Sequence, residues 1–192
     1  MTQAMFLENF GFYKEKIPQD LYSNLLKESL NCTDIVNSGI TEKGVAKHFR
    51  LKDTAQQLNQ YIIPLIKNYE ADFPGLGQIG ILTKSLPYKI EEQWINHQKA
   101  GEFIPNHVHQ GIYSYSIWIK IPQIDDNNYQ GNFEFTYNNI IGNIIRQRFR
   151  LTKENEGEII FFPSKLPHNV YPFLNSSETR ISISGNIILD AG

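Results

Sequence analysis

The chain has 192 residues, of which 41% are hydrophobic and 20% charged, and this ordinary globular composition excludes a wholly disordered or fibrous protein. Lys and Arg number 18 and Asp and Glu 20, so the formal charge gives no argument for a nucleic acid or membrane partner. The single cysteine, Cys32, excludes an intramolecular disulfide and a cysteine zinc site. No apolar run approaches the ~18 residues of a membrane span, and the first eleven residues lack a secretory signal's basic start. We therefore expect a cytoplasmic protein.

Two helices are predicted in the first 75 residues. Between Pro18 and Leu30, the proline suits a first helical turn and leucines recur on one face. Apolar residues at helical spacing predict a second helix over roughly Leu51–Asn68, which Pro64 would kink or split. The segment Phe73-Pro74-Gly75 ends this second pattern.

From residue 76 onward the pattern is that of short strands, separated by breaks rich in Gly, Pro, Asn and Asp. The candidate strands are Gln78–Lys84, Glu91–Gln98, His107–His109, Tyr113–Ile121, Phe133–Tyr137, Ile144–Leu151, Glu158–Phe162, His168–Tyr171 and Thr179–Leu189. Short strands behind a helical lead-in predict a mainly β protein with N-terminal helices, built as a two-sheet jelly roll. No linker interrupts the chain, so we expect one domain over residues 1–192, with a helical lead-in over 1–75 and a β core over 76–192.

Three of the five histidines lie where a metal site would need them. His107 and His109 flank Val108, and alternate residues of a strand share one face with Cα atoms ~6.6 Å apart, so both imidazoles can reach one ion. His168 follows an apolar strand and a turn that contains Pro163 and Pro167. Three neutral imidazoles would leave positions on a transition metal open for water, oxygen or a chelating substrate. The alternative is a His-x-His pair that lies on the surface or is merely hydrogen-bonded.

The last predicted strand places an arginine among small polar residues. Arg180, Ser182, Ser184 and Asn186 share one parity, while isoleucines occupy the other. Burying an arginine is costly without an anionic partner, and its forked guanidinium suits a carboxylate. The alternative is a surface strand whose arginine pairs with a neighbour such as Glu178.

These residues resemble the 2-oxoglutarate- and Fe(II)-dependent oxygenases, which have the double-stranded β-helix fold (jelly roll, cupin-like). The family pattern is His-x-(Asp/Glu/His), a distal His, and Arg-x-Ser about a dozen residues later. Five segments are similar to small 2-oxoglutarate oxygenases of bacteria and marine phages: Trp94–Asn96, Gly101–His109, Ser114–Ser116, Phe161–His168 and Arg180–Ser184. The resemblance covers roughly residues 90 to 189, and the N-terminal helices resemble no family that we can name.

The resemblance implies a role for each matching residue. His107 would be the first iron ligand and His168 the distal one. Arg180 would bind the far carboxylate of 2-oxoglutarate, with Ser182 beside it. Further candidate contacts to this cosubstrate are Asn96, Gln98 and Tyr115. The implied reaction uses Fe(II) and O2 to decarboxylate 2-oxoglutarate oxidatively and to hydroxylate a C–H bond of an unidentified substrate.

The sequence departs from the family at the second ligand. The usual residue there is a carboxylate, and this chain has His109. One alternative is that Glu102, Glu134 or Glu158 supplies a carboxylate from elsewhere, and another shifts the motif so that His109 becomes the first ligand. We expect the three histidines to be the ligands.

Two other functions stay open. One is a jelly-roll metalloprotein with a three-His site and no 2-oxoglutarate, either a zinc hydrolase or a cupin-type dioxygenase, in which Arg180 binds the substrate itself. The other is a non-enzymatic jelly-roll binding protein whose histidines are incidental. A homodimer could cover an exposed strand edge, and neither the residues nor the resemblance names the prime substrate.

Overall fold

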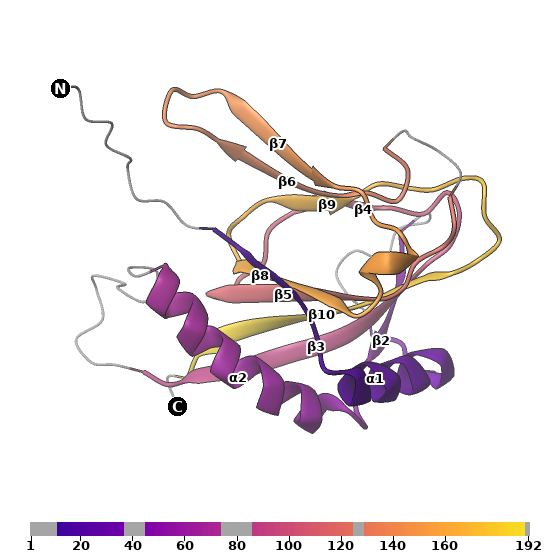
Figure 1. The fold of residues 1–192 in the computed structure, drawn as a ribbon, viewed down its shortest axis with the longest axis horizontal. Helices are drawn as coiled ribbons and strands as arrows, with labels where there is room; N and C mark the ends of the chain where they lie inside the picture. Colours follow the sequence, from indigo (N-terminus) through magenta and orange to yellow (C-terminus); the bar gives the residue numbers. More distant parts are fainter. Residues whose placement is uncertain (1–10, 37–44, 74–85, 125–128, 191–192) are drawn as a thin grey trace.

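Two β-sheets face each other, and two helices cover the outer side of the larger sheet (Figure 1). This architecture comes from a computed structural model, which describes residues 11–36, 45–73, 86–124 and 129–190. The predicted mainly β fold with N-terminal helices is confirmed. Within the described segments, no helix is both long enough and apolar enough to cross a membrane.

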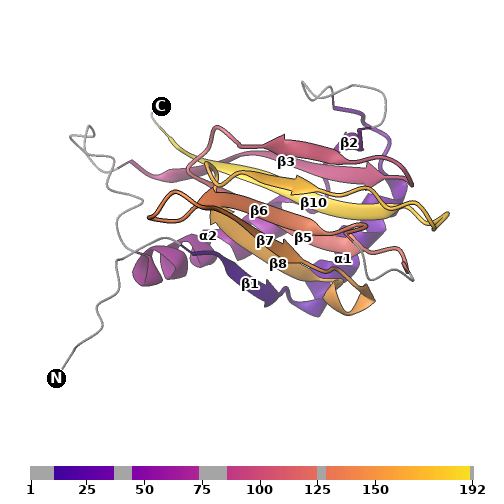
Figure 2. The same ribbon diagram turned by 90° about the horizontal axis from the view of Figure 1, so that it is seen from above.

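Both sheets are antiparallel, and Figure 2 shows them from above. The larger sheet contains, in spatial order, β1 (Tyr13–Lys16), β8 (Glu158–Pro163), β5 (Tyr113–Lys120), β10 (Arg180–Leu189), β3 (Tyr88–Gln98) and β2 (Lys47–Arg50). The smaller sheet contains β4 (Ile104–His107), β9 (His168–Val170), β6 (Phe133–Asn138) and β7 (Ile144–Phe149). A short 3-10 helix, Lys153–Asn155, precedes β8. From β3 to β10 the chain passes from one sheet to the other after each strand, except at the β6–β7 pair, as in a jelly roll.

The two predicted helices are present with shifted bounds. Helix α1 spans Gln19–Asn31 and α2 spans Ala55–Asp72, with Pro64 inside α2. Leu51, predicted to start the second helix, instead lies ahead of α2 as a buried core residue. The end of α2 at Asp72 agrees with the predicted stop at Phe73.

Most predicted strands are found, with three differences. The strand predicted over His107–His109 ends at His107, so His109 lies beyond β4 and does not share a strand face with it. The four-residue strands β1 and β2 were not predicted, because each lies at an edge of the larger sheet and carries little alternation. The candidate strand Gln78–Lys84 falls outside the described residues.

The two faces of the larger sheet differ in chemistry. Ile183 and Ile187 of β10 pack with the helices in one core. Ser182, Ser184 and Asn186 of the same strand face the space between the sheets and line a cavity there. The predicted division of β10 into an apolar and a polar face is therefore confirmed, and the polar face is the one that meets the smaller sheet.

Candidate metal centre

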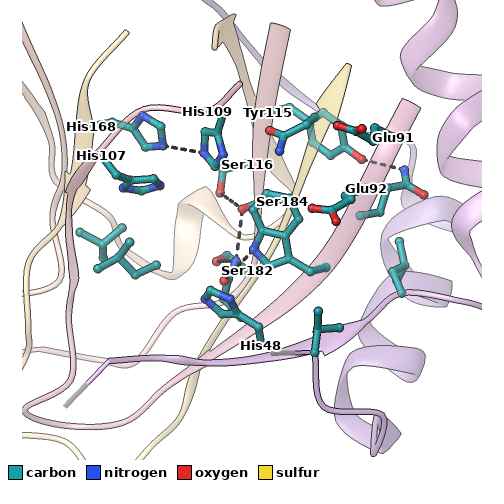
Figure 3. A pocket seen from close by; sticks show the side chains of 18 of the residues that line it. His48, Glu91, Glu92, His107, His109, Tyr115, Ser116, His168, Ser182 and Ser184 are labelled. Carbon is teal, nitrogen blue, oxygen red and sulfur yellow. Dashed lines mark hydrogen bonds between the residues drawn. The ribbon is translucent and has the colours of Figure 1, made fainter. Parts of the chain in front are cut away.

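A cavity of about 540 Å³ lies between the sheets (Figure 3). His107, His109 and His168 line one end of it. Glu91 and Glu92 of β3 line the cavity on the opposite side of Ser184 from His168. A cavity of this size can hold a small organic molecule.

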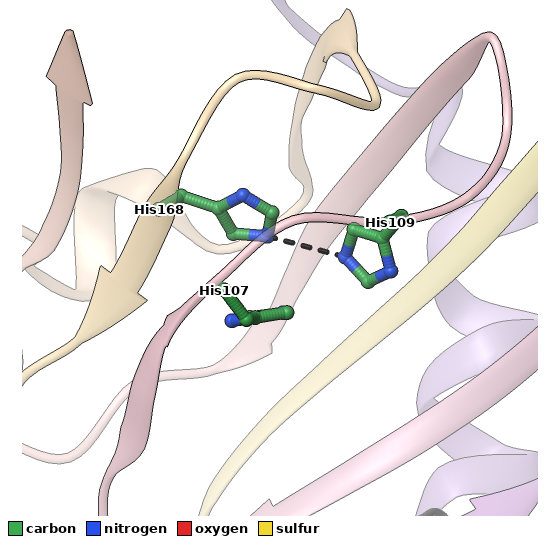
Figure 4. A group of neighbouring side chains, drawn as sticks. All are labelled: His107, His109 and His168. Carbon is green, nitrogen blue, oxygen red and sulfur yellow. Dashed lines mark hydrogen bonds between the residues drawn. The ribbon is translucent and has the colours of Figure 1, made fainter.

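The three histidines converge although they come from different places in the chain (Figure 4). His107 ends β4 and His168 begins β9, and the two are direct partners across this antiparallel pair. His109 follows β4, where its backbone N–H donates to the carbonyl of Ser164 at 2.9 Å. One ligand nitrogen from each ring lies within 4.8 Å of the others, and the Nε2 atoms of His109 and His168 are 3.2 Å apart. This spacing suits three ligands of one ion.

Backbone carbonyls fix the orientation of two of the rings. Nδ1 of His107 donates to the carbonyl of Pro105 at 2.8 Å, and Nδ1 of His168 donates to that of Leu166 at 2.9 Å. Because the proton is held on Nδ1, the lone pair is on Nε2. Metal-binding histidines are held in this way in proteins, since the second hydrogen bond sets the tautomer.

Burial keeps the imidazoles neutral. It lowers the pKa of His168 to about 3 and that of His109 to about 4, and the neighbouring His107 adds to both shifts. Burial also lowers the pKa of His107. Neutral imidazole is the form that binds metals, and it suits first-row transition ions including iron. The donor set therefore fits Fe(II).

Among the described residues, no carboxylate joins this cluster. Glu134 lies on the far side of β6, where it pairs with Arg148. Glu158 pairs with Lys14 at 2.9 Å, and Glu102 accepts a hydrogen bond from a backbone amide. The alternative in which Glu102, Glu134 or Glu158 supplies the missing carboxylate is therefore wrong.

Polar side chains continue from the histidines along the inner face of the larger sheet. The amide nitrogen of Asn96 donates to Ser182 Oγ at 3.3 Å and to Ser184 Oγ at 3.2 Å. Ser184 Oγ in turn donates to Ser116 Oγ at 3.4 Å. On the other side, the indole N–H of Trp94 donates to Asn96 Oδ1 at 3.0 Å. Asn96 and Ser182, both predicted cosubstrate contacts, thus share one cavity with the histidines.

Arg180 is a buried cation on this same inner face. Its side chain is 3% exposed, and Nη1 donates to the carbonyl of Gly131 at 2.8 Å. Burial lowers its pKa to about 10, which leaves it protonated at neutral pH. In the part of the chain that the structure describes, no carboxylate pairs with it, and Arg180 is not one of the residues that line the cavity. Glu178, the alternative partner, instead lies near Lys120 and Lys153, so that alternative is wrong.

Comparison with known proteins identifies the family. A family model described as "Putative 2OG-Fe(II) oxygenase" matches residues 92–186, a range that includes all three histidines and Arg180. The chain belongs to this family. Its members' description implies Fe(II) and 2-oxoglutarate, and the histidine cluster supplies fitting metal ligands. No curated protein matches the sequence.

Solved structures share the fold of this oxygenase. A Pseudomonas putida prolyl-4-hydroxylase is 14% identical, with 94% of each chain covered and a TM-score of 0.60. A viral collagen prolyl hydroxylase from Paramecium Bursaria Chlorella virus-1 is 14% identical, with 92% of this chain and 94% of that chain covered and a TM-score of 0.56. The non-heme alpha-ketoglutarate-dependent epimerase SnoN from nogalamycin biosynthesis is 12% identical, with 95% and 79% covered and a TM-score of 0.63. These likenesses confirm the double-stranded β-helix.

Two predicted contacts of the oxygenase are engaged elsewhere. The amide of Gln98, which lies opposite Arg180, donates to the carbonyls of Glu102 at 2.6 Å and Tyr171 at 3.2 Å. Tyr115 borders the cavity, but its ring belongs to the core beneath the helices and its hydroxyl accepts a hydrogen bond from Gln93 at 2.7 Å. The structure therefore does not bring these two polar groups to the histidines.

Three further inner-face residues were given no role in the site by the sequence analysis. Ser116 lies opposite Ser184, and Trp118 lies opposite Ser182. His48 of β2 lies opposite Asn96 and lines the cavity. The side chain of Trp118 is fully buried, and its N–H has no acceptor among the described residues. The alternation of β5 could have indicated that Ser116 and Trp118 share one face of the strand. Which residues they lie opposite depends on the strand register, which the sequence does not give.

Proposed function

We propose that this 2OG-Fe(II) oxygenase is a hydroxylase that couples oxidative decarboxylation of 2-oxoglutarate by O2 to oxidation of a C–H bond. The observation that carries the proposal is Arg180, a buried cation without a carboxylate partner in the described chain, on the sheet face that also meets the three histidines. An isolated buried charge is strongly unfavourable. A ligand carboxylate at Arg180 would remove that cost through a charge-assisted hydrogen bond.

In this proposal the residues between the sheets bind the metal ion and orient 2-oxoglutarate. His107, His109 and His168 would hold Fe(II), which supplies the redox chemistry when it is bound. Arg180 would take the far carboxylate of 2-oxoglutarate, and Ser182, two residues along the same face, would donate beside it. The Asn96 amide holds the Ser182 hydroxyl in place, which prepares this end of the cavity for a carboxylate.

A second function is favoured by the donor set. Among the described residues the cluster consists of three histidines and no carboxylate. Such a donor set also suits a metalloprotein that uses no 2-oxoglutarate, such as a zinc hydrolase or a cupin-type dioxygenase. In that function, Arg180 would bind an anionic group of the substrate.

An anaerobic titration separates the two functions. Fe(II) and then 2-oxoglutarate are added to the metal-free protein while the visible metal-to-ligand charge-transfer band is recorded. We expect a band in the parent protein, its loss in His168→Ala, and metal binding without a band in Arg180→Met. Arg146→Met is the matched control, because Arg146 is an exposed residue of β7.

Metal uptake by the parent protein without a band and without 2-oxoglutarate binding would contradict the oxygenase function and favour the second one. Where the band forms, succinate release on addition of candidate substrates tests hydroxylation itself. Because the solved neighbours include an epimerase as well as hydroxylases, the oxidised product must be identified by mass spectrometry.

A further inference from the structure

We infer that this metal centre binds its metal ion and a dianionic ligand as a strongly coupled pair, because none of the described carboxylates joins the histidine cluster to neutralise the metal. The inference rests on the proposed function and extends it. It concerns the energetics of binding, and it follows from the charges that face the space between the sheets.

The first observation is the neutrality of the ligand set. All three groups of the cluster are imidazoles. The carboxylates that line the same cavity, Glu91 and Glu92, are exposed and lie on the other side of Ser184 from His168 (Figure 3). The remaining cavity wall near the histidines consists of neutral groups such as Asn96 and Ser182. A metal ion held there would keep its full charge.

The second observation is the distribution of buried charges. Among the described residues, Glu134 is the one buried carboxylate, and it is paired with Arg148 on the outer side of the smaller sheet. Arg180 is buried and faces the inner side. A divalent ion would contribute two positive charges and Arg180 one, so the loaded interior would hold three, and none of the described residues places a buried, unpaired carboxylate beside them. Charges in such a poorly solvated region interact strongly and need neutralisation.

These charges define the ligand. It should carry two anionic groups, one that chelates the metal and one that reaches Arg180, as a 2-oxo dicarboxylate does. Each partner then raises the affinity for the other by the same factor. In a centre with a ligating carboxylate, part of the neutralisation is already present before the dianion binds. We therefore expect stronger coupling here than in a variant to which a ligating carboxylate has been added.

Mn(II) binding tests the inference without any turnover. The electron paramagnetic resonance signal of free Mn(II) reports the affinity at fixed pH, in a buffer without chelating anions, with and without saturating 2-oxoglutarate. We expect 2-oxoglutarate to raise the Mn(II) affinity of the parent protein at least ~10-fold, within the range of about 5- to 150-fold that is usual for coupled sites. His109→Asp should bind Mn(II) more tightly than the parent protein in the absence of 2-oxoglutarate, and should show a smaller rise when it is added.

Asn143→Asp is the matched control. It places a carboxylate at an exposed position outside the cavity and the cluster, so it should keep the coupling of the parent protein. His109→Glu is measured beside His109→Asp, since its longer side chain reaches further, and thermal melts confirm that each variant is folded.

Three outcomes would overturn the inference. The first is tight Mn(II) binding by the parent protein that 2-oxoglutarate does not change. The second is a rise that is equally large in the folded His109 variants, because chelation alone would then explain it. The third is that neither His109 variant binds Mn(II) more tightly than the parent protein without 2-oxoglutarate. If the charge-transfer band still forms with Fe(II), the proposed function stands; if it is also absent, the function fails as well.

Discussion

At the residue scale, Gly185 allows the Tyr115 side chain to lie across β10. The two residues are partners in neighbouring strands, and Gly185 is also the partner of Gln93, whose amide reaches the Tyr115 hydroxyl. A Cβ atom at position 185 would lie 2.6 Å from Cζ of Tyr115, well inside van der Waals contact. Because this ring is fully buried, it has little room to move aside.

We therefore expect Gly185→Ala to lower the free energy of unfolding by about 1–3 kcal/mol, the usual cost of overpacking a core. Urea denaturation measures it. In the Tyr115→Leu background the same substitution should cost less, because the clashing phenol is gone. An equal cost in both backgrounds would contradict this explanation.

Trp118 is the second residue whose environment predicts a measurable effect. Its buried N–H lacks an acceptor in the described structure, and it faces the same interior as Ser182, its partner across β5 and β10. A buried donor without a partner is costly, and a ligand carboxylate near Ser182 would provide the acceptor. We expect Trp118→Phe to weaken 2-oxoglutarate binding about tenfold, the value of one hydrogen bond to a charged group.

Isothermal titration of the Mn(II)-loaded protein with 2-oxoglutarate measures this loss. The Mn(II) affinity without 2-oxoglutarate serves as the control and should not change, because Trp118 is not part of the histidine cluster. An unchanged affinity for 2-oxoglutarate would mean that the indole N–H does not contact it.

At the element scale, the start of α2 depends on a side chain of α1. The Glu28 carboxylate accepts hydrogen bonds from the backbone amides of Lys52, Asp53 and Thr54 at 2.6, 3.0 and 2.8 Å, and from the Thr54 hydroxyl at 2.6 Å. Thr54 caps α2 without a side-chain hydrogen bond of its own to the helix. Glu28 therefore performs the capping role from another helix, which joins the two helices.

We expect Glu28→Gln to lower the free energy of unfolding at neutral pH by about 1–2 kcal/mol, the usual range for a lost cap. Burial raises the pKa of Glu28, but the hydrogen bonds from Thr54, Lys52 and Asp53 outweigh it, so the pKa is lowered in the folded protein. The stabilisation is then complete above the unfolded-state pKa of about 4.3 and is lost as the pH falls through the lower folded-state pKa.

Urea midpoints measured from pH 7 down to about pH 3 test the sign of this effect. The difference between the parent protein and Glu28→Gln should shrink only at the acid end. Glu154→Gln, an exposed substitution in the 3-10 helix, should behave like the parent protein throughout. A difference that grows on acidification would contradict the capping role.

The same elements show how far the sequence determines the fold. Repeated leucines predicted α1, and the alternation of β10 predicted which of its faces is polar, because both signals extend over many residues. The edge strands β1 and β2 span only four residues each, which is too short for alternation to be recognised. The start of α2 was missed because its cap, Glu28, comes from a residue distant in the sequence.

For the site, the sequence predicted which histidines gather but not how. His107 and His168 meet as partners in adjacent strands, whereas His109 reaches the cluster from beyond the end of β4. Tyr115 was predicted from its nearness in sequence to the ligands, yet its parity on β5 directs it to the helices. Only the pairing of β5 with β10 shows that Ser116 and Trp118 have the inward parity, and register is a tertiary property.

At the scale of the whole molecule, the interior between the sheets combines a buried cation with a metal-binding cluster, while the helices cover the opposite face of the larger sheet. The strands that carry these groups come from both sheets: β4 and β9 belong to the smaller sheet and β10 to the larger one. A metal ion and a dianion bound together would therefore link the two sheets, and binding to the folded state alone stabilises it.

We expect Mn(II) and 2-oxoglutarate together to raise the melting temperature by roughly 5–10 °C, since saturation at ~100 times the dissociation constant contributes about 2.7 kcal/mol, and each kcal/mol moves the midpoint by ~2–4 °C in a protein of this size. Differential scanning calorimetry of the protein with each ligand alone and with both measures the increments, and EDTA should reverse them. The joint increment should exceed the sum of the separate ones, because each ligand neutralises charge that the other leaves exposed. Arg180→Met should lose the part due to 2-oxoglutarate, whereas Arg146→Met should keep it; merely additive increments would contradict a shared site between the sheets.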